Sequence, residues 1–442
     1  MTHDLTKGKI TPLLIQFTLP LVFGNLFQLT YNAVDSIIVG QYVGTDALAA
    51  VGTATPIVNL AILFISGMCM GASILISAQY GAKQFDVLKR QISTTMLGGL
   101  GFSLAFAVIC ILLLHPILLL LQVPKAILPM TASFLRIMFL GLGFTFLYNF
   151  LANTMRALGD SRTPLIFLMI SAVLNVVGDL LLVVCLGFGV AGSAVSTVCS
   201  EALCCLCCIL YIQKKIPFLR LGRKWFVFDP GLLKQTVHYG MTSALQQTCL
   251  QIGKIIIQLF VNPMGVNVIA AFNVVNRIDD FAYTPEQNIG HAMTTLLAQN
   301  RGAQKNDRIR KGFFSGLFIE FCYSVFLFFL IYFGAPHLVS LFVQKGQTEV
   351  VRLGTQYLQL IAVMYILPAF TNGLQGYFRG MGDLKVTLWS TFMNMAGRVA
   401  AAYLLAPRFG MAGFAFANLA GWVLMLICEI PLLVHSIRQF GS

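Results

Sequence analysis

Residues 19–52, LPLVFGNLFQLTYNAVDSIIVGQYVGTDALAAVG, form a long apolar stretch with the carboxylate Asp35 near its centre. On insertion scales, a carboxylate in the middle of a membrane-spanning helix costs roughly 2.5–3.5 kcal/mol. Such a residue is tolerated where it faces the protein interior or a wet cavity, so Asp35 is a candidate functional residue. Pro20, upstream, removes a backbone hydrogen bond and can bend the helix. A bendable helix that carries a protonatable group suits a coupled transporter.

The composition places the whole chain in a membrane. Of its 442 residues, 57% are hydrophobic and only 10% are charged, and the mean hydropathy is +0.82. A soluble domain has about 25% charged residues. Apolar runs long enough to cross a bilayer recur along the chain, which predicts an all-α polytopic membrane protein. We expect twelve spans, near residues 12–39, 47–77, 92–122, 128–154, 163–186, 189–213, 236–262, 268–299, 312–334, 354–377, 384–406 and 411–437.

The net charge of +13 reflects membrane orientation and does not indicate nucleic-acid binding. With both termini placed in the cytoplasm, 21 of the 29 Lys and Arg residues fall in the cytoplasmic loops and ends. This positive-inside bias sets orientation and carries no information about substrate. We therefore expect a multi-pass protein of the cell membrane (a plasma or inner membrane), surrounded by lipid and monomeric, with both termini cytoplasmic and no nucleic-acid partner.

The sequence repeats itself about 221 residues apart, half its length. Three motifs recur at this spacing, which is a strong signal of internal duplication: AQYGA (78–82) with AQNRGA (298–303), RALGD (156–160) with RGMGD (379–383), and GVAGSA (189–194) with GMAGFA (410–415). Six spans per half is an even number, so the halves have the same orientation and a pseudo-twofold axis along the membrane normal. We expect an N-lobe at 1–213, a basic cytoplasmic linker at 214–230 and a C-lobe at 231–442.

Polar residues recur within the predicted spans of the N-lobe. Asn175 and Asp179 are four residues apart, so they share one face of the fifth span. Further polar side chains that could join Asp35 and Asp179 in one pocket are Tyr31, Asn32, Asn149 and Asn153. Such a pocket could poise a carboxylate to take up a proton near neutral pH. Alternatively, each Asp only accepts hydrogen bonds from neighbouring helices.

The C-lobe carries a different set of charges. By the repeat offset of about 221, Lys254 falls close to the position of Asp35, and Arg398 close to that of Asn175. The eighth span contains Asp279, Asp280 and Glu286, and Glu286 directly follows a mid-span proline. These groups could neutralise one another in an interior ion-pair network, or could line a cavity that binds charged substrates. Glu286 is the strongest single candidate of this lobe. Glu201, Glu320 and Glu429 rank lower, because each lies in a span without a partner motif; any of them could be a buried hydrogen-bonded group.

Several kinds of chemistry lack a motif in this sequence. The nucleotide-binding pattern GxxxxGK[ST] is absent, which argues against ATP as the energy source. The eleven cysteines are interpreted as packing residues, since those at 204–208 point around much of a helix and suit no single metal ion. We therefore expect no enzyme activity and no cofactor, with H⁺ or Na⁺ as the coupling ion.

In combination, these motifs resemble the multidrug and toxic compound extrusion (MATE) family, and most of all its bacterial DNA-damage-inducible-protein-F-like branch. The resemblance rests on Pro20, VDSIIVG around Asp35, the paired motifs above, and Asn175 with Asp179. It implies a V-shaped pair of six-helix bundles that exports organic cations or amphipathic drugs in exchange for inward H⁺ or Na⁺. It also implies that Asp35, Asn153, Asn175 and Asp179 form the coupling site, where Na⁺ could bind to the two aspartates.

One position departs from the family pattern, and one alternative function remains. Members with a C-lobe cation site carry an acid in the seventh span, where this chain has Lys254, so coupling through the N-lobe is favoured. A lipid-linked oligosaccharide flippase of related fold is the alternative. It needs a basic central cavity, to which Lys254, Arg277 and Arg398 could contribute. In the efflux hypothesis, Asp279, Asp280, Glu286 and Arg398 belong to the substrate cavity with Tyr31, Asn32, Asn149 and Lys254.

Overall fold

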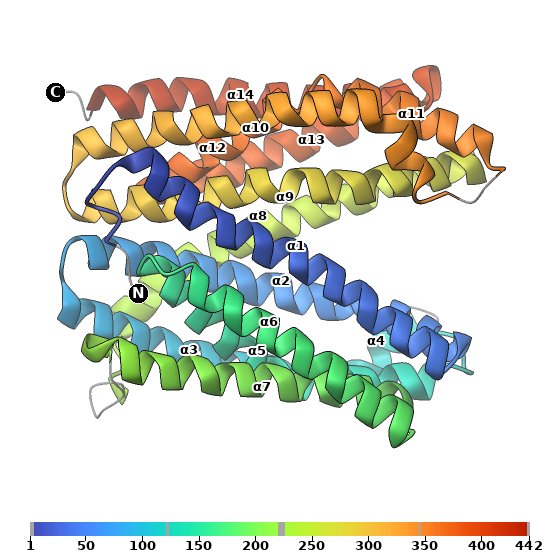
Figure 1. Cartoon of the computed structure of the whole chain (residues 1–442), viewed down its shortest axis with the longest axis horizontal. Helices are drawn as coiled ribbons and strands as arrows, with labels where there is room; N and C mark the ends of the chain where they lie inside the picture. The colour runs from blue at the N-terminus through green and yellow to red at the C-terminus, as the bar shows by residue number, and fades with distance from the viewer. Residues whose placement is uncertain (1–3, 121–122, 220–225, 344–345, 440–442) are drawn as a thin grey trace. The chain divides into compact units, whose positions relative to one another are not determined.

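The structure is a computed structural model that describes residues 4–120, 123–219, 226–343 and 346–439, without the side chains of residues 32–37, 218 and 439. Every regular element among these residues is a helix, and they contain no β-strand. The predicted all-α membrane fold is thereby confirmed (Figure 1). The helices follow one another as α1 (Ile10–Tyr42), α2 (Thr45–Gly81), α3 (Phe85–Leu112), α4 (Leu114–Leu120), α5 (Leu128–Ala157), α6 (Arg162–Asp179), a π-helix (Leu180–Cys185), α7 (Gly189–Lys215), α8 (Pro230–Val261), α9 (Val266–Gly302), α10 (Asn306–Ser340), α11 (Thr348–Ala362), α12 (Ile366–Met381), α13 (Leu384–Phe409) and α14 (Met411–Gln439).

The described helices are consistent with twelve spans. Nine are long and apolar enough to cross a membrane, and α11 with α12 makes a tenth, bent by 52°. The remaining two predicted spans, 268–299 and 384–406, coincide with α9 and α13, whose sequences contain more polar residues.

Two predicted spans are interrupted, each beside a proline. The span predicted at 92–122 is divided into α3 and α4 at Leu113, because Pro116 has no N–H to donate to the carbonyl of Leu112. The span predicted at 354–377 is broken between α11 and α12. Pro368 likewise cannot bond the carbonyl of Met364, which accepts from the Leu367 amide instead (2.9 Å).

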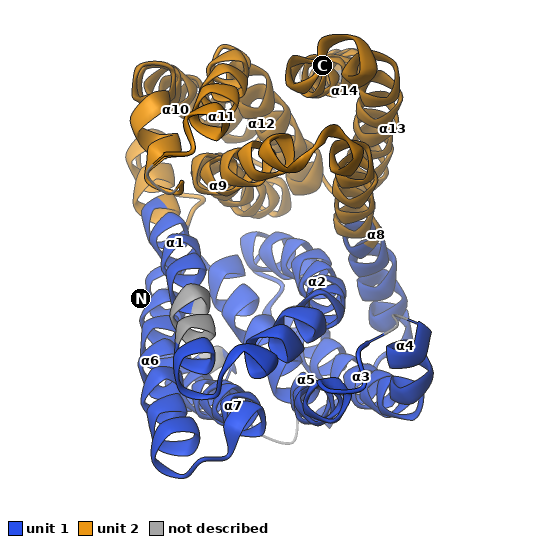
Figure 2. Ribbon diagram, turned by 90° about the vertical axis from the view of Figure 1, so that its right-hand side faces the viewer, with its two compact units in different colours: residues 1–4, 19–244 blue, residues 5–18, 245–442 orange. Residues whose placement is uncertain are grey.

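The chain divides into two compact units, coloured separately in Figure 2. The first is built mainly from Leu19–Ala244, and the second from Leu5–Thr18 with Leu245–Ser442. Two helices, α1 and α8, therefore pass from one unit to the other along their length.

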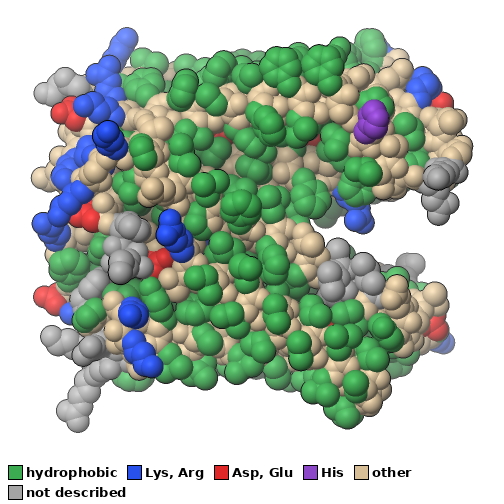
Figure 3. All heavy atoms as spheres, viewed as in Figure 1, with side chains coloured by type: hydrophobic (Ala, Val, Ile, Leu, Met, Phe, Trp, Pro, Cys, Tyr) green, Lys and Arg blue, Asp and Glu red, His purple; other side chains and the backbone are tan. Residues whose placement is uncertain are grey.

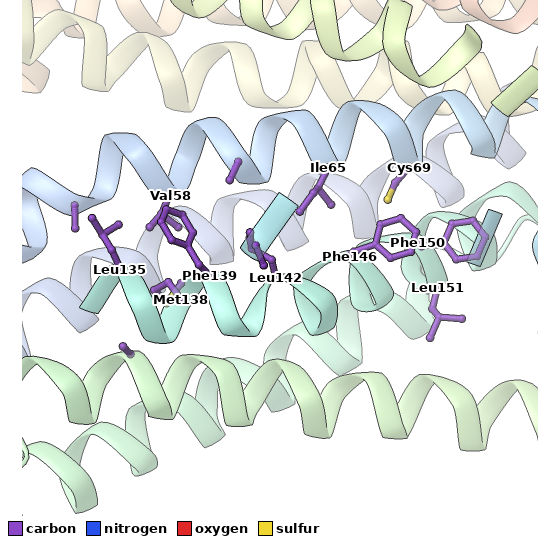
Figure 4. Close-up of a cluster of buried hydrophobic side chains, with 14 of the residues drawn as sticks. Val58, Ile65, Cys69, Leu135, Met138, Phe139, Leu142, Phe146, Phe150 and Leu151 are labelled. Carbon is purple, nitrogen blue, oxygen red and sulfur yellow. The ribbon is translucent and has the colours of Figure 1, made fainter. Parts of the chain in front are cut away.

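Each unit has an apolar interior and apolar sides. In the first unit, α2 and α5 pack through large side chains such as Ile65, Phe139 and Phe146, as Figure 4 shows. On the outside, the helices expose hydrophobic side chains along their length (Figure 3). On α10, for example, Phe318 is 63% and Phe333 70% exposed. Large apolar surface of this kind suits contact with lipid.

The internal duplication extends to unusual backbone conformations. Gly159 and Gly382 end their helices in the repeated RxxGD motifs, and both have a φ of 85°. This left-handed conformation is costly for residues with a Cβ, so glycine is needed at both turns. Lys83 (φ 59°) and Gln304 (φ 55°), the two described non-glycine residues with positive φ, are also 221 positions apart, each just after a repeated AQ motif. We conclude that the two halves repeat the same local structure.

The segment before α1 is tied to the rest of the second unit by Arg308 of α10. Its guanidinium donates to the carbonyls of Gly8 (2.8 Å), Leu5 (3.1 Å) and Lys7 (3.2 Å), and its Nε donates to Oδ1 of Asn300 (3.1 Å). The Leu5 amide in turn donates to Gln299 (3.1 Å). The start of α1 is thereby anchored to the ends of α9 and α10.

Candidate functional site

Pro20 lies where α1 passes between the units. The second unit includes α1 up to Thr18, and the first begins at Leu19. Because Pro20 has no N–H, the carbonyl of Gln16 lacks its usual helical donor at this crossing. The helix continues to Tyr42, and Tyr31 on it is half-buried. The side chains of Asn32 and Asp35 lie outside the described residues.

Asn175 and Asp179 lie together on the buried face of α6. Asn175 is 2% and Asp179 0% exposed. The Asn175 amide donates to Thr197 (3.1 Å) and Ser196 (3.4 Å) of α7, and the Ser196 hydroxyl donates to the Asn175 carbonyl (2.7 Å). At Gly178, a Cβ would come within 2.4 Å of the Ser196 hydroxyl, so glycine permits this close approach. The pair is thus a polar face held tightly against α7.

A change in helix type directly follows Asp179. The chain is α-helical through Asp179 and π-helical from Leu180 to Cys185. π-Helical turns are rare and frequently occur at functional sites, since they disturb the regular hydrogen-bond ladder. Asp179 therefore occupies the junction between a regular and an irregular helix segment.

The other predicted N-lobe residues form local contacts. Asn149 and Asn153 are half-buried on α5, and each amide donates to the carbonyl four residues earlier, at 2.8 Å. The hydrogen bonds described for these two residues therefore stay within α5. The structure brings Asn175 and Asp179 together on one buried face of α6.

In the second unit, the predicted charges separate into two pairs. Lys254 of α8 lies 3.7 Å from Asp280 of α9, and each side chain is 58% exposed. This contact is therefore a surface pair, outside the interior of the unit. Asp279, by contrast, is 8% exposed and accepts a hydrogen bond from the Tyr365 hydroxyl. Arg398 of α13 is half-buried and interacts electrostatically with Asp279.

Aromatic rings cover this part of the second unit. The ring of Tyr283 is 5.4 Å from that of Tyr365 and 6.3 Å from that of Trp422, measured between centroids. Asp279 thus lies in a buried setting with a tyrosine donor and a nearby guanidinium, which is suited to holding a carboxylate.

Glu286, the strongest C-lobe candidate from the sequence, belongs to neither pair. It is 0% exposed, and neither of its carboxyl oxygens has a hydrogen-bond partner among the described residues. Glu320 of α10, which the sequence pattern ranked lower, is 1% exposed and has the same unsatisfied oxygens in the described structure. Two other glutamates within spans do have partners: half-buried Glu201 accepts from Thr145, and one oxygen of buried Glu429 accepts from Ser390.

The comparisons with known proteins agree on one family. The MatE family profile matches residues 20–181 and again residues 243–404, once in each half. "Probable multidrug resistance protein YoeA" of Bacillus subtilis is 29% identical over 404 residues, covering 89% of this chain and 86% of that protein. "Multidrug export protein MepA" of Staphylococcus aureus is 22% identical over 439 residues, covering 98% and 95%.

A solved structure, described as the outward-facing conformation of a multidrug resistance MATE family transporter of the MOP superfamily, shares the fold. Its TM-score is 0.91 at 20% identity, with 100% of this chain and 98% of that chain covered. The family profile accounts for well over half of the sequence, in two copies that follow the internal duplication. The chain therefore belongs to the MATE family of multidrug efflux transporters.

Proposed function

We propose that this protein is a secondary antiporter that exports cationic or amphipathic organic compounds in exchange for inward H⁺ or Na⁺. The names of the relatives YoeA and MepA, which refer to multidrug resistance and export, support this substrate class. The family match favours efflux over a lipid-linked oligosaccharide flippase. The branch of the family and the cytoplasmic position of the termini stay predictions.

The observation that carries the proposal is the environment of Asp179. A fully buried carboxyl group with an amide neighbour on the same helix face responds strongly to loading with a proton or cation, because burial disfavours its charged form. The π-helix that begins at the next residue is an irregular segment in which the backbone can rearrange when Asp179 binds a proton or cation. The membrane potential is sufficient to drive export against a modest drug gradient, because one charge moving across the membrane is worth about 2.3 kcal/mol per 100 mV.

Pro20 supplies a hinge for the same cycle. It lies two residues after the crossing of α1 between the units, and Asp35 lies further along that helix. In our proposal, Asp35 and Asp179 are deprotonated when the protein is open to the inside, and they then favour binding of a cationic substrate. Loading them from outside with H⁺ or Na⁺ bends α1 at Pro20 and releases the substrate.

Dye efflux from vesicles tests the proposal. The purified protein is reconstituted, and efflux of ethidium is followed under a pH gradient and, separately, under a Na⁺ gradient. We expect one of the two gradients to drive efflux, and Asp35→Asn and Asp179→Asn to abolish it while expression stays intact. The control is Glu349→Gln, which changes an exposed acid paired with Arg352. Efflux that needs neither gradient would refute antiport, and unchanged efflux in Asp35→Asn or Asp179→Asn would remove that residue from the mechanism.

A further inference from the structure

Two fully buried glutamates lie on neighbouring helices of the second unit. Glu286 is on α9 and Glu320 on α10, and these helices pack against each other. The Tyr323 hydroxyl donates to the Ala282 carbonyl at 3.1 Å and joins the helices at this level. Tyr323 is about one turn after Glu320, and Ala282 is one turn before Glu286. The two carboxyl groups lie within electrostatic range of each other.

The groups that face the two glutamates cannot neutralise them. From α9 these are Asp279 and Tyr283, from α10 Tyr323, and from the start of α12 Tyr365. Arg398 of α13 interacts electrostatically with Asp279 and Tyr283. No carboxyl oxygen of Glu286 or Glu320 has a hydrogen-bond partner among the described residues.

Close helix packing keeps the two glutamates away from solvent. At Gly316, one turn before Glu320, a Cβ would come within 2.2 Å of the Met293 sulfur, and at Gly290 within 2.9 Å of the Asn372 carbonyl. Glycine at these positions lets α10 and α12 approach α9 closely. The exposures of 0% and 1% follow from this contact.

An ionised carboxylate in such a place is costly. Moving a charge out of water costs several kcal/mol even after relaxation, and here no bonded cation offsets that cost. A second carboxylate close by adds like-charge repulsion, so two neighbouring acids favour holding at least one proton between them. Glu201 and Glu429 differ because hydroxyl groups donate to both of them. Burial alone therefore does not distinguish Glu286 and Glu320 from Glu429. The lack of hydrogen-bond partners for their carboxyl oxygens does.

We propose that Glu286 and Glu320 form a proton-binding pair inside the second unit, separate from Asp35 and Asp179. In the conformation described here, the pair holds a proton. When a conformational change admits water between α9 and α10, the carboxyl O–H bond breaks and the proton passes to water, leaving a carboxylate. The role of this release in transport rests on the proposed antiport, whereas the protonation itself does not.

Infrared spectroscopy of the purified protein tests the protonation without any transport. A protonated carboxyl group has a carbonyl absorption distinct from that of a carboxylate or a carboxamide. We expect Glu286→Gln or Glu320→Gln to reduce this absorption, and the double variant to remove the contribution of the pair. Glu349→Gln, at an exposed and ion-paired acid, is expected to leave it unchanged. Unchanged absorption in the double variant would show that both glutamates are ionised, for example around Na⁺, and would overturn the proposal.

The second measurement addresses release of the proton. The number of protons moved per ethidium molecule is measured in vesicles for the parent and for the double variant Glu286→Gln/Glu320→Gln. Gln has nearly the shape of a protonated Glu, so we expect the double variant to elute as a folded protein and to move fewer protons per dye molecule. An unchanged proton count would overturn the release step. If the parent moves no dye, antiport fails, but the infrared result still decides whether the pair binds a proton.

Discussion

Replacing Arg308 with Ala tests whether the segment before α1 is tied to the rest of the second unit. Arg308 makes four described hydrogen bonds, three to backbone carbonyls and one to Asn300, which is 0% exposed. Hydrogen bonds to charged groups contribute about 1.5–3 kcal/mol each in net terms, but those to exposed atoms contribute less. Counting mainly the bonds to the buried Leu5 and Asn300, we expect the substitution to destabilise the anchored conformation of the segment before α1 by about 3 kcal/mol.

This loss predicts a measurable change in amide exchange. Since every 1.4 kcal/mol is a factor of ten, the segment should open about a hundredfold more often. Hydrogen exchange of the Leu5 amide, which donates to Gln299, reports the opening in the purified protein. Arg310→Ala is the matched control, because Arg310 is an exposed cation two positions away on the same helix. Exchange that is unchanged in Arg308→Ala, or equally accelerated in Arg310→Ala, would refute the reasoning.

Two further substitutions test packing and a buried hydrogen bond in the second unit. Gly376→Ala places a Cβ within 2.7 Å of the Gly290 carbonyl, and overpacking of this kind costs about 1–3 kcal/mol, so thermal unfolding in detergent should occur at lower temperature. Gly334→Ala is the control, since its nearest atom is 3.6 Å away; equal stability of the two variants would contradict the helix contact. Tyr365→Phe removes the hydroxyl that donates to Asp279 and should cost about 1–3 kcal/mol. Tyr403→Phe, at a 66% exposed tyrosine, should leave the unfolding temperature unchanged, and parent-like stability of Tyr365→Phe would show that Asp279 does not need this donor.

The fold could be predicted from sequence because its determinants are local. Apolar runs of sufficient length specify helices in a membrane, and repeated motifs reveal the duplication. The left-handed turns at Gly159 and Gly382 follow directly from the RxxGD pattern. The breaks at Leu113 and between α11 and α12 were missed, although Pro116 and Pro368 were visible signals. Spans were predicted from the average hydropathy of long apolar runs. A single proline changes this average little, so the average does not reveal the break.

The candidate site could be predicted only in part, because partners come from distant positions in the chain. Asn175 and Asp179 share a helix face by spacing alone. By contrast, Tyr365 donates to Asp279 across 86 positions, and Glu429 accepts from Ser390 across 39. Sequence spacing cannot distinguish an acid with such a partner from one without it. For this reason Glu320 and Glu429 looked equivalent in the sequence, and the structure separates them.

The two halves repeat the same local backbone structure but differ in their charges, and this difference bears on the proposed ion coupling. By the repeat offset of about 221, Lys254 lies within two residues of the position that corresponds to Asp35, and Arg398 within two residues of the one that corresponds to Asn175. A symmetric pair of acid sites is therefore not built into the duplication. The second unit instead buries acids on α9 and α10. By contrast, α2, which corresponds to α9 by the repeat offset, has no charge between residues 56 and 77. A buried, unsatisfied carboxyl group is destabilising wherever it occurs. Its presence at a new position in one half, together with a cation close to the old one, argues that the two units contribute different steps to the proposed antiport cycle.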